Sequence, residues 1–210
     1  MKVAIYGGTF NPIHKGHTGL AQAVCKTGMV DEVWLMVSPL NPLKRNQQTD
    51  LQPTDVRLHM ARLATEGIPC LKVSDFETHL PVPSYTYNTL QELRRAYPEH
   101  TFSLLVGEDN WERFCHWYKA DEILAQHDII VYGRNRPLPS PPQGEGVISV
   151  FSKGSNHSLP LGRVGKGSAL YEVSSTQIRE SLRSGPLAFA RRWLHPAVYR
   201  YVRQQRLYQS

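Results

Sequence analysis

Two histidines near the N-terminus, His14 and His17, have the types and the spacing to bind an anion together. They follow the glycine pair Gly7-Gly8 and precede an apolar helical pattern over residues 18–24. The β-branched and aromatic run before the glycines predicts a buried strand. A strand, a glycine-rich turn and a helix N-terminus favour phosphate, because N–H groups and the helix dipole point toward the ligand. Both imidazoles can therefore face one phosphate from the same side.

A lone histidine near a helix start most often caps the helix and faces solvent. The full run Gly7 to His17 is far more specific, because it resembles the signature of the nucleotidyltransferase superfamily. The hallmark of that superfamily is His-x-Gly-His after the first strand, and His14-Lys15-Gly16-His17 matches it in full. The resemblance implies that ATP is bound by Gly7, Gly8, Thr9, Phe10, His14, His17, Gly107, Asp109, Ser175, Thr176 and Arg179.

Four further segments are similar to one branch of the superfamily, the bacterial nicotinate-nucleotide adenylyltransferases. Residues 38–44 resemble the loop after the second strand, whose lysine (here Lys44) approaches the phosphates. Residues 83–90 resemble the segment that opens the substrate helix, and residues 106–118 resemble the site for nucleotide and pyridine. Residues 174–179 are close to the second phosphate-binding signature of the superfamily. The resemblance extends from residue 3 to the C-terminal helix, apart from residues 135–168.

This resemblance implies an enzyme that joins ATP and nicotinate mononucleotide to give deamido-NAD and pyrophosphate, a step of NAD synthesis. The attacking phosphate is already ionised at neutral pH, so catalysis needs positioning and charge neutralisation rather than a general base. The catalytic residues implied are His14, His17, Lys44 and Arg179. The residues implied for the mononucleotide are Asn11, Lys44, Thr86, Trp117 and Tyr118. Mg²⁺ would arrive with ATP and bridge its β- and γ-oxygens, and no protein metal site is assigned.

Alternatives remain at this stage. The same transfer to nicotinamide mononucleotide or to another phosphate, such as pantetheine phosphate, would use a similar site. The chain length and the Ser84-Tyr85-Thr86 segment disfavour pantetheine phosphate, and the complete His-x-Gly-His disfavours a non-catalytic nucleotide-binding regulatory module. Asn88 stands where the family commonly has Asp, and its carbonyl oxygen could accept a hydrogen bond from an amide substrate. The alternative for Trp117 is an ordinary core residue.

Composition restricts the setting. No run approaches the roughly 18 apolar residues of a membrane span, so no membrane partner is expected. The three cysteines lack any CxxC pairing, which favours free thiols and a cytoplasmic location. A net charge of +6 indicates anionic partners. The basic residues are dispersed without a nucleic-acid motif, so phosphorylated small molecules are favoured over nucleic acid. The sequence leaves open whether the chain is a monomer or a homo-oligomer.

The fold class expected is α/β. Strands at residues 3–6, 32–37, 71–74, 102–106 and 128–132 alternate with helical patterns, including those at 54–64 and 84–97. This alternation predicts a doubly wound parallel sheet, similar to the Rossmann-like nucleotidyltransferase fold, within one domain over residues 1–210. Residues 135–168 are expected as a loop-rich excursion with one short strand at 147–150. A strand at 170–173 and a small helical part over 174–210 complete the expectation.

Overall fold

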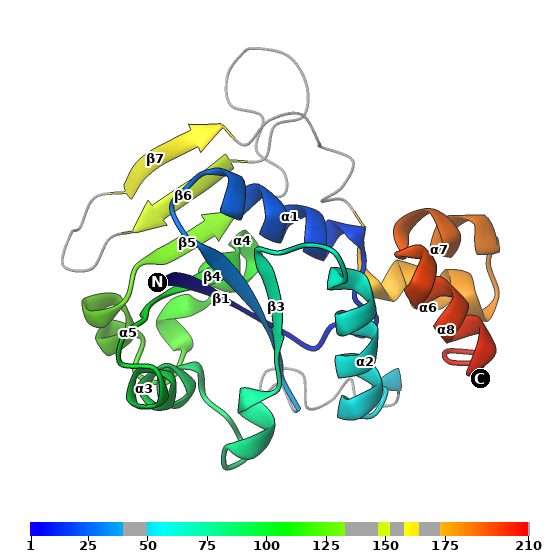
Figure 1. Ribbon diagram of the computed structural model, residues 1–210, viewed down its shortest axis with the longest axis horizontal. Coiled ribbons are helices and arrows are strands. Elements are labelled where there is room, and N and C mark those ends of the chain that lie inside the picture. The colour runs from blue at the N-terminus through cyan, green and yellow to red at the C-terminus, as the bar shows by residue number, and fades with distance from the viewer. Residues whose placement is uncertain (40–49, 133–146, 152–157, 164–172, 210) are drawn as a thin grey trace.

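The protein is described here by a computed structural model that covers residues 1–39, 50–132, 147–151, 158–163 and 173–209. Its centre is one seven-stranded sheet with the order β3-β2-β1-β4-β5-β6-β7 (Figure 1). The strands are β1 (Lys2–Gly8), β2 (Glu32–Val37), β3 (Leu71–Ser74), β4 (Thr101–Gly107), β5 (Ile129–Tyr132), β6 (Val147–Phe151) and β7 (Ser158–Arg163). The first five of these strands in the sheet order run parallel, which confirms the predicted α/β fold class.

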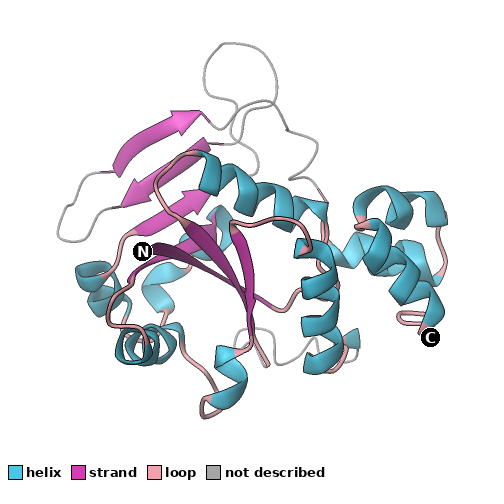
Figure 2. Cartoon of the chain, in the orientation of Figure 1, coloured by secondary structure: helices cyan, strands magenta, loops and turns pink. Residues whose placement is uncertain are grey.

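Helices cover both faces of the sheet (Figure 2). They are α1 (Lys15–Lys26), α2 (Thr54–Thr65), α3 (Thr86–Ala96), α4 (Glu108–Trp111), α5 (Ala120–Gln126), α6 (Ser175–Arg183), α7 (Leu187–Trp193) and α8 (Pro196–Gln204). The connections that the structure describes include the short 3₁₀ helices η2 (Phe76–His79) and η3 (Phe114–His116). No helix among the described residues is long and apolar enough to cross a membrane.

The central strand β1 shows why the sheet is buried on both sides. Its Ala4 and Tyr6 belong to the core shared with α1, α2 and the C-terminal helices. Its Val3 and Ile5 belong to the core shared with α3 and α5. Because successive side chains of a strand point to opposite faces, a strand covered on both faces must be apolar throughout. This is the pattern that predicted the strand from sequence.

The second half of the chain departs from the expectation in one respect. The stretch 135–168 contains two strands rather than one, because β7 follows β6 and pairs with it in antiparallel orientation. Pro160 and Gly162 disfavour a strand when the sequence is considered alone. Among the described residues β7 is the last strand in the sheet order, and an edge strand tolerates a proline without an N–H donor.

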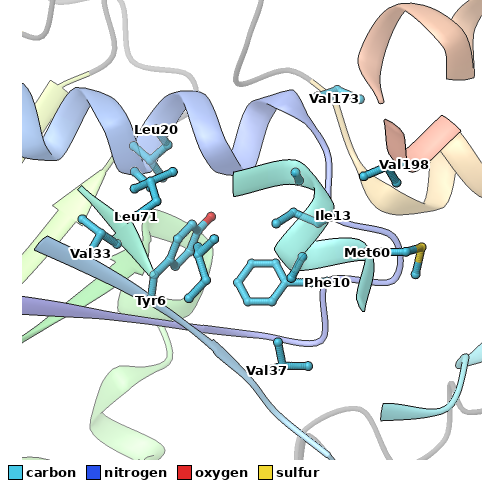
Figure 3. Packing of buried hydrophobic residues seen from close by; sticks show 14 of the residues in the cluster. Tyr6, Phe10, Ile13, Leu20, Val33, Val37, Met60, Leu71, Val173 and Val198 are labelled. Carbon is cyan, nitrogen blue, oxygen red and sulfur yellow. The ribbon is translucent and has the colours of Figure 1, made fainter. Parts of the chain in front are cut away.

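Two other predictions concern the end of the chain. Of the strand predicted at 170–173, residues 170–172 lie outside the described part, and Val173 is not in a strand. The C-terminal helical part is present as α6, α7 and α8, and α8 packs against α2. Ile178, Val198 and Val202 from this part are fully buried in the core that α1 and α2 cover. Figure 3 shows Val198 in that core with Phe10 and Ile13 from the loop after β1. The three cysteines are free, as predicted.

Candidate functional site

A pocket of about 390 Å³ lies at the carboxyl ends of β1 and β4, a volume typical of small-molecule sites. The order of the sheet reverses between these two strands, since β1 leads outward to β2 and β4 leads outward to β5. Ligands of doubly wound sheets bind at such a switch point. The predicted site residues that line the pocket are Gly7, Gly8, Thr9, Phe10, Asn11, His14, His17, Thr86, Gly107, Asp109, Trp117, Tyr118, Ser175, Thr176 and Arg179. Lys44 is the one predicted site residue that lies outside the described residues.

The two histidines begin helix α1. His14 is the N-cap residue, and its backbone N–H donates to Nδ1 of His17 at 3.2 Å. The rings are stacked, with centroids 3.7 Å apart, and the ring of His17 also meets the edge of Phe10 at 5.1 Å. A neutral imidazole that accepts at Nδ1 carries its proton on Nε2. The helix start therefore fixes His17 as a donor through Nε2, which is the form needed to bind a phosphate oxygen.

The glycines at the ends of β1 and β4 differ in what a side chain would contact at each position. A Cβ on Gly8 would lie 3.1 Å from the ring of Phe10, which itself has a φ of 46°. A Cβ on Gly107 would lie 2.5 Å from Oδ1 of Asp109, so a side chain there would displace that carboxylate. A Cβ on Gly7 would meet no heavy atom within 4 Å, so the strand end stays open to the pocket. Small residues thus keep both strand ends accessible.

Helix α6 brings the C-terminal part to the first loop. Ser174 caps the helix, with its side chain accepting from the N–H of Gln177 at 3.2 Å. The hydroxyl of Ser175 donates to the carbonyl oxygen of Pro12 at 2.9 Å. Arg179 donates from Nη1 to the carbonyl oxygen of Asn11 at 2.8 Å and from Nη2 to Oγ1 of Thr176 at 3.2 Å. These bonds orient the guanidinium, which lines the same pocket as the two histidines.

Asn11 makes its contacts within the chain. Its Nδ2 donates to the carbonyl oxygen of Asp50 at 2.8 Å. Its Oδ1 accepts from the N–H of Gln52 at 3.2 Å and from the hydroxyl of Tyr208 at 2.7 Å. The residue lines the pocket, and its predicted role as a substrate ligand stays a prediction. In this geometry the Asn11 side chain holds the loop after β1 in place.

Arg57 lies outside the pocket lining but holds the loops around the site, a role that sequence reasoning missed. It is 1% exposed, and burial lowers the pKa of its guanidinium by desolvating the charge. Its five hydrogen bonds go to the carbonyl oxygens of Thr9, Ser38, Pro39 and Gln52 and to Oγ1 of Thr54. This one side chain ties the loop after β1 to the loop after β2. A single arginine within an amphipathic helix pattern gives no sequence signal of such a role.

Glu77 is the second missed residue. It is 6% exposed and lines the pocket. Its carboxylate accepts from the hydroxyl of Ser38 at 2.8 Å and from that of Thr89 at 2.9 Å. Burial raises the pKa of this carboxyl group, and the two hydrogen bonds oppose that shift. Glu77 thus links the loop after β2 to helix α3, which begins at Thr86.

The opposite end of the pocket is aromatic. Trp117 packs on Phe114, with ring centroids 5.1 Å apart, and also lines the pocket, so it serves core and site together. Tyr118 and Tyr85 lie at the mouth with 48% and 39% of their surfaces exposed, and their rings are 5.0 Å apart. Helix α3 begins at Thr86, directly after Tyr85, and its N-cap residue Tyr85 makes no side-chain cap hydrogen bond. The first N–H groups of a helix have no partner within the helix, so they are candidate donors to an acceptor.

Asn88 does not take the position that the sequence suggested for it. It is exposed on α3 and is absent from the pocket lining. The hypothesis that its carbonyl oxygen accepts from a substrate amide therefore has no support in this geometry. The replacement of the usual Asp by Asn lies on the outer surface of the helix.

Comparison with known proteins shows the family of the chain. The cytidylyltransferase-like family matches residues 5–181, which include the histidine pair and Arg179. The chain belongs to the cytidylyltransferase-like family. Among curated relatives, a probable nicotinate-nucleotide adenylyltransferase of Bacteroides fragilis is 44% identical over 97% of this chain and 92% of the relative. One of Bacteroides thetaiotaomicron is 42% identical with the same coverage. These relatives confirm the branch that the motifs predicted.

A solved structure shares the fold of this cytidylyltransferase-like chain. Plasmodium falciparum nicotinic acid mononucleotide adenylyltransferase, complexed with NaAD, superposes with a TM-score of 0.74 at 18% identity. The match covers 99% of this chain and 97% of that chain. At this identity the likeness shows the fold alone.

Proposed function

We propose that this protein transfers the adenylyl group of ATP to nicotinate mononucleotide, giving deamido-NAD and pyrophosphate. The observation that carries the proposal is one pocket with two chemically different ends. His14, His17 and Arg179 form a cationic and donor-rich end, and Trp117 with Tyr118 forms an aromatic end. A triphosphate fits the first end and a pyridine ring fits the second. The names of the Bacteroides relatives support these two substrates.

The reaction needs little from acid–base groups. An oxygen of the mononucleotide phosphate attacks the α-phosphorus of ATP, a new P–O bond forms, and the bond to the β-phosphate oxygen breaks. Negative charge grows on the pyrophosphate that leaves. His17 and Arg179 are already held by hydrogen bonds within the chain, which supports a role for Nε2–H of His17 and for the guanidinium in stabilising that charge. His14 and Lys44 complete the predicted catalytic set.

Magnesium enters with the nucleotide as part of the substrate. Among the described residues there is no group of three or more His, Cys, Asp or Glu side chains that could hold a metal ion. Mg²⁺ is commonly held by phosphate oxygens and water with one or two carboxylates. Asp109, which lines the pocket, is the carboxylate beside the predicted ATP segment. The ion would neutralise phosphate charge there.

The preference for the acid follows from the start of α3. The helix N-terminus offers N–H donors and a positive dipole end near Thr86, beside Trp117 in the pocket wall. A carboxylate is an acceptor only, so it suits these donors. An amide would bring N–H₂ donors that need acceptors of their own. Nicotinate mononucleotide is therefore the preferred mononucleotide.

The test is turnover of the purified chain with Mg–ATP and one phosphate acceptor at a time. Pyrophosphate release and chromatographic detection of deamido-NAD should both depend on nicotinate mononucleotide. The acceptor-free reaction is the control for ATP hydrolysis. Turnover with pantetheine phosphate but not with nicotinate mononucleotide would overturn the proposal, and absence of turnover with ATP binding retained would favour a regulatory module.

A further inference from the structure

The end of the chain reaches back to the first loop of the pocket. Tyr208 is 4% exposed, and its hydroxyl donates to Oδ1 of Asn11 at 2.7 Å across 197 residues of sequence. The chain turns there through left-handed backbone at Arg206 and Tyr208, with φ values of 52° and 62°. The ring packs in the same core as Val198 and Val202 of α8. The aromatic ring thus secures the tail, and the hydroxyl contacts the pocket loop.

Asn11 connects Tyr208 to Arg179 in the pocket wall. The same Oδ1 accepts from Gln52, and Nδ2 donates to the carbonyl oxygen of Asp50, so the side-chain amide plane is fixed from three sides. The backbone carbonyl of Asn11 then accepts from Nη1 of Arg179 at 2.8 Å. Because the three side-chain bonds hold the loop that carries this carbonyl, losing one of them would let the loop shift and would move the acceptor that aligns the guanidinium.

The surroundings keep the Tyr208 hydroxyl in its donor form. Burial raises the pKa of Tyr208 well above its ordinary value, while the positive charges of Arg57 and Arg179 act in the opposite direction. The neutral phenol therefore persists throughout the working range of pH. A phenylalanine at this position would keep the packing and remove only the donor.

We propose that Tyr208 is a positioning residue for the triphosphate end, acting through Asn11 on Arg179. The inference rests on the proposed function for the chemistry of that end. It differs from a purely structural role of the tail, because it places the effect on ATP rather than on stability or on the mononucleotide. Small losses of alignment at a reacting centre carry large kinetic penalties.

The first test compares Tyr208→Phe with Tyr201→Phe in the full-length protein. Tyr201 lies on α8 and contacts His59, away from the pocket lining, so it is a matched control from the same end of the chain. For Tyr208→Phe we expect kcat/KM for ATP to fall about tenfold, with KM for the mononucleotide changed less than about twofold. Tyr201→Phe should match the parent protein in kcat/KM for ATP and in KM for the mononucleotide. The inference would be overturned if Tyr208→Phe left kcat/KM for ATP unchanged, or if it weakened the use of ATP and of the mononucleotide equally.

The second test asks whether Tyr208 acts through Arg179. If it does, adding Tyr208→Phe to an Arg179→Ala variant should change kcat/KM for ATP by less than about twofold further. Full additivity of the two losses would contradict the proposed route. Calorimetry measures ATP affinity independently of turnover, and it is applied to the parent protein, Tyr208→Phe, Arg179→Ala and the double variant. Failure of the parent protein to form deamido-NAD would overturn the proposed function, and the ATP affinities would still decide the role of Tyr208.

Discussion

The two ends of the pocket are built in opposite ways. At the phosphate end His14 and Asn11 are buried, with 5% and 6% exposure, His17 and Arg179 are half-buried, and Arg57 holds the loop behind them with 1% exposure. At the pyridine end the rings of Tyr85 and Tyr118 stand at the mouth with a third to a half of their surface exposed. One end is fixed before a ligand arrives, and the other still has apolar surface to bury.

This difference matches the chemistry proposed for each end. Stabilising charge that develops during reaction requires donors that are already in position, because any reorganisation adds to the barrier. Recognising a flat ring requires apolar contact area and a few hydrogen-bond donors, and the side chains that supply them can adjust when the ring binds. Changes at the phosphate end should therefore reduce kcat or ATP use, and changes at the pyridine end should alter the choice of mononucleotide.

The largest effect is expected from His17→Ala. The variant removes a donor that the N–H of His14 holds in one tautomer. Loss of one preorganised donor to transition-state charge lowers kcat by roughly 10²-fold or more. ATP affinity should weaken much less, which calorimetry can measure beside steady-state rates. Near-normal turnover of this variant would show that His17 is not part of the mechanism. It would also contradict the idea that the phosphate end acts through donors fixed in advance.

The next effect concerns the choice of substrate at the aromatic end. An amide donor left without a partner in a buried site costs about 1–3 kcal/mol. We therefore expect kcat/KM for nicotinate mononucleotide to exceed that for nicotinamide mononucleotide by about tenfold to a hundredfold. Equal values for the two would show that this end does not discriminate.

Asn88 provides the matched control for that measurement. Because it is exposed and outside the pocket lining, Asn88→Asp should leave the ratio of the two kcat/KM values unchanged. A ratio that rises in this variant would place the discrimination on the outer side of α3 instead of in the pocket.

A smaller effect is expected from Arg179→Lys. The guanidinium spans the carbonyl oxygen of Asn11 and the hydroxyl of Thr176 while lining the pocket. A lysine keeps the charge but loses the planar fork, so KM for ATP should rise by about tenfold. Thermal unfolding should stay close to that of the parent protein. An unchanged KM for ATP would exclude Arg179 from the nucleotide site.

The smallest effect is a pH dependence of stability at Glu77, between the two ends. Burial raises the pKa of its carboxyl group from the ordinary value of 4.5, so the folded chain holds this proton more tightly than the unfolded chain. The contribution of Glu77 to the free energy of unfolding therefore decreases as the pH rises above 4.5. Glu77→Gln removes this loss.

Denaturant titrations of both proteins at several pH values give the measurement. The stability of Glu77→Gln relative to the parent protein should increase with pH over the range above 4.5 and then level off. A difference that stays constant with pH would show that the carboxyl group titrates normally.

The strands and helices of the parallel sheet could be predicted from sequence because their hydrophobic patterns depend on neighbouring residues alone. Apolar runs such as residues 32–37 must be strands covered on both faces, and their alternation with helices implies the parallel sheet. The strand β7 was missed because its proline and glycine argue against pairing, whereas an edge strand needs no N–H donor at every residue. That tolerance depends on the place of the strand in the sheet, which local sequence does not specify.

The chemistry of the site follows the same division. Glycines, imidazoles and hydroxyls within short runs were enough to predict which segments bind phosphate, because a helix start and a tight turn are local structures. Only the tertiary structure decided that Arg57, Glu77 and Tyr208 hold those segments in place. Each acts on chain that is distant in sequence, as in the bond from Tyr208 to Asn11 across 197 residues. A buried polar side chain takes its role from partners that only the folded chain brings within hydrogen-bond distance.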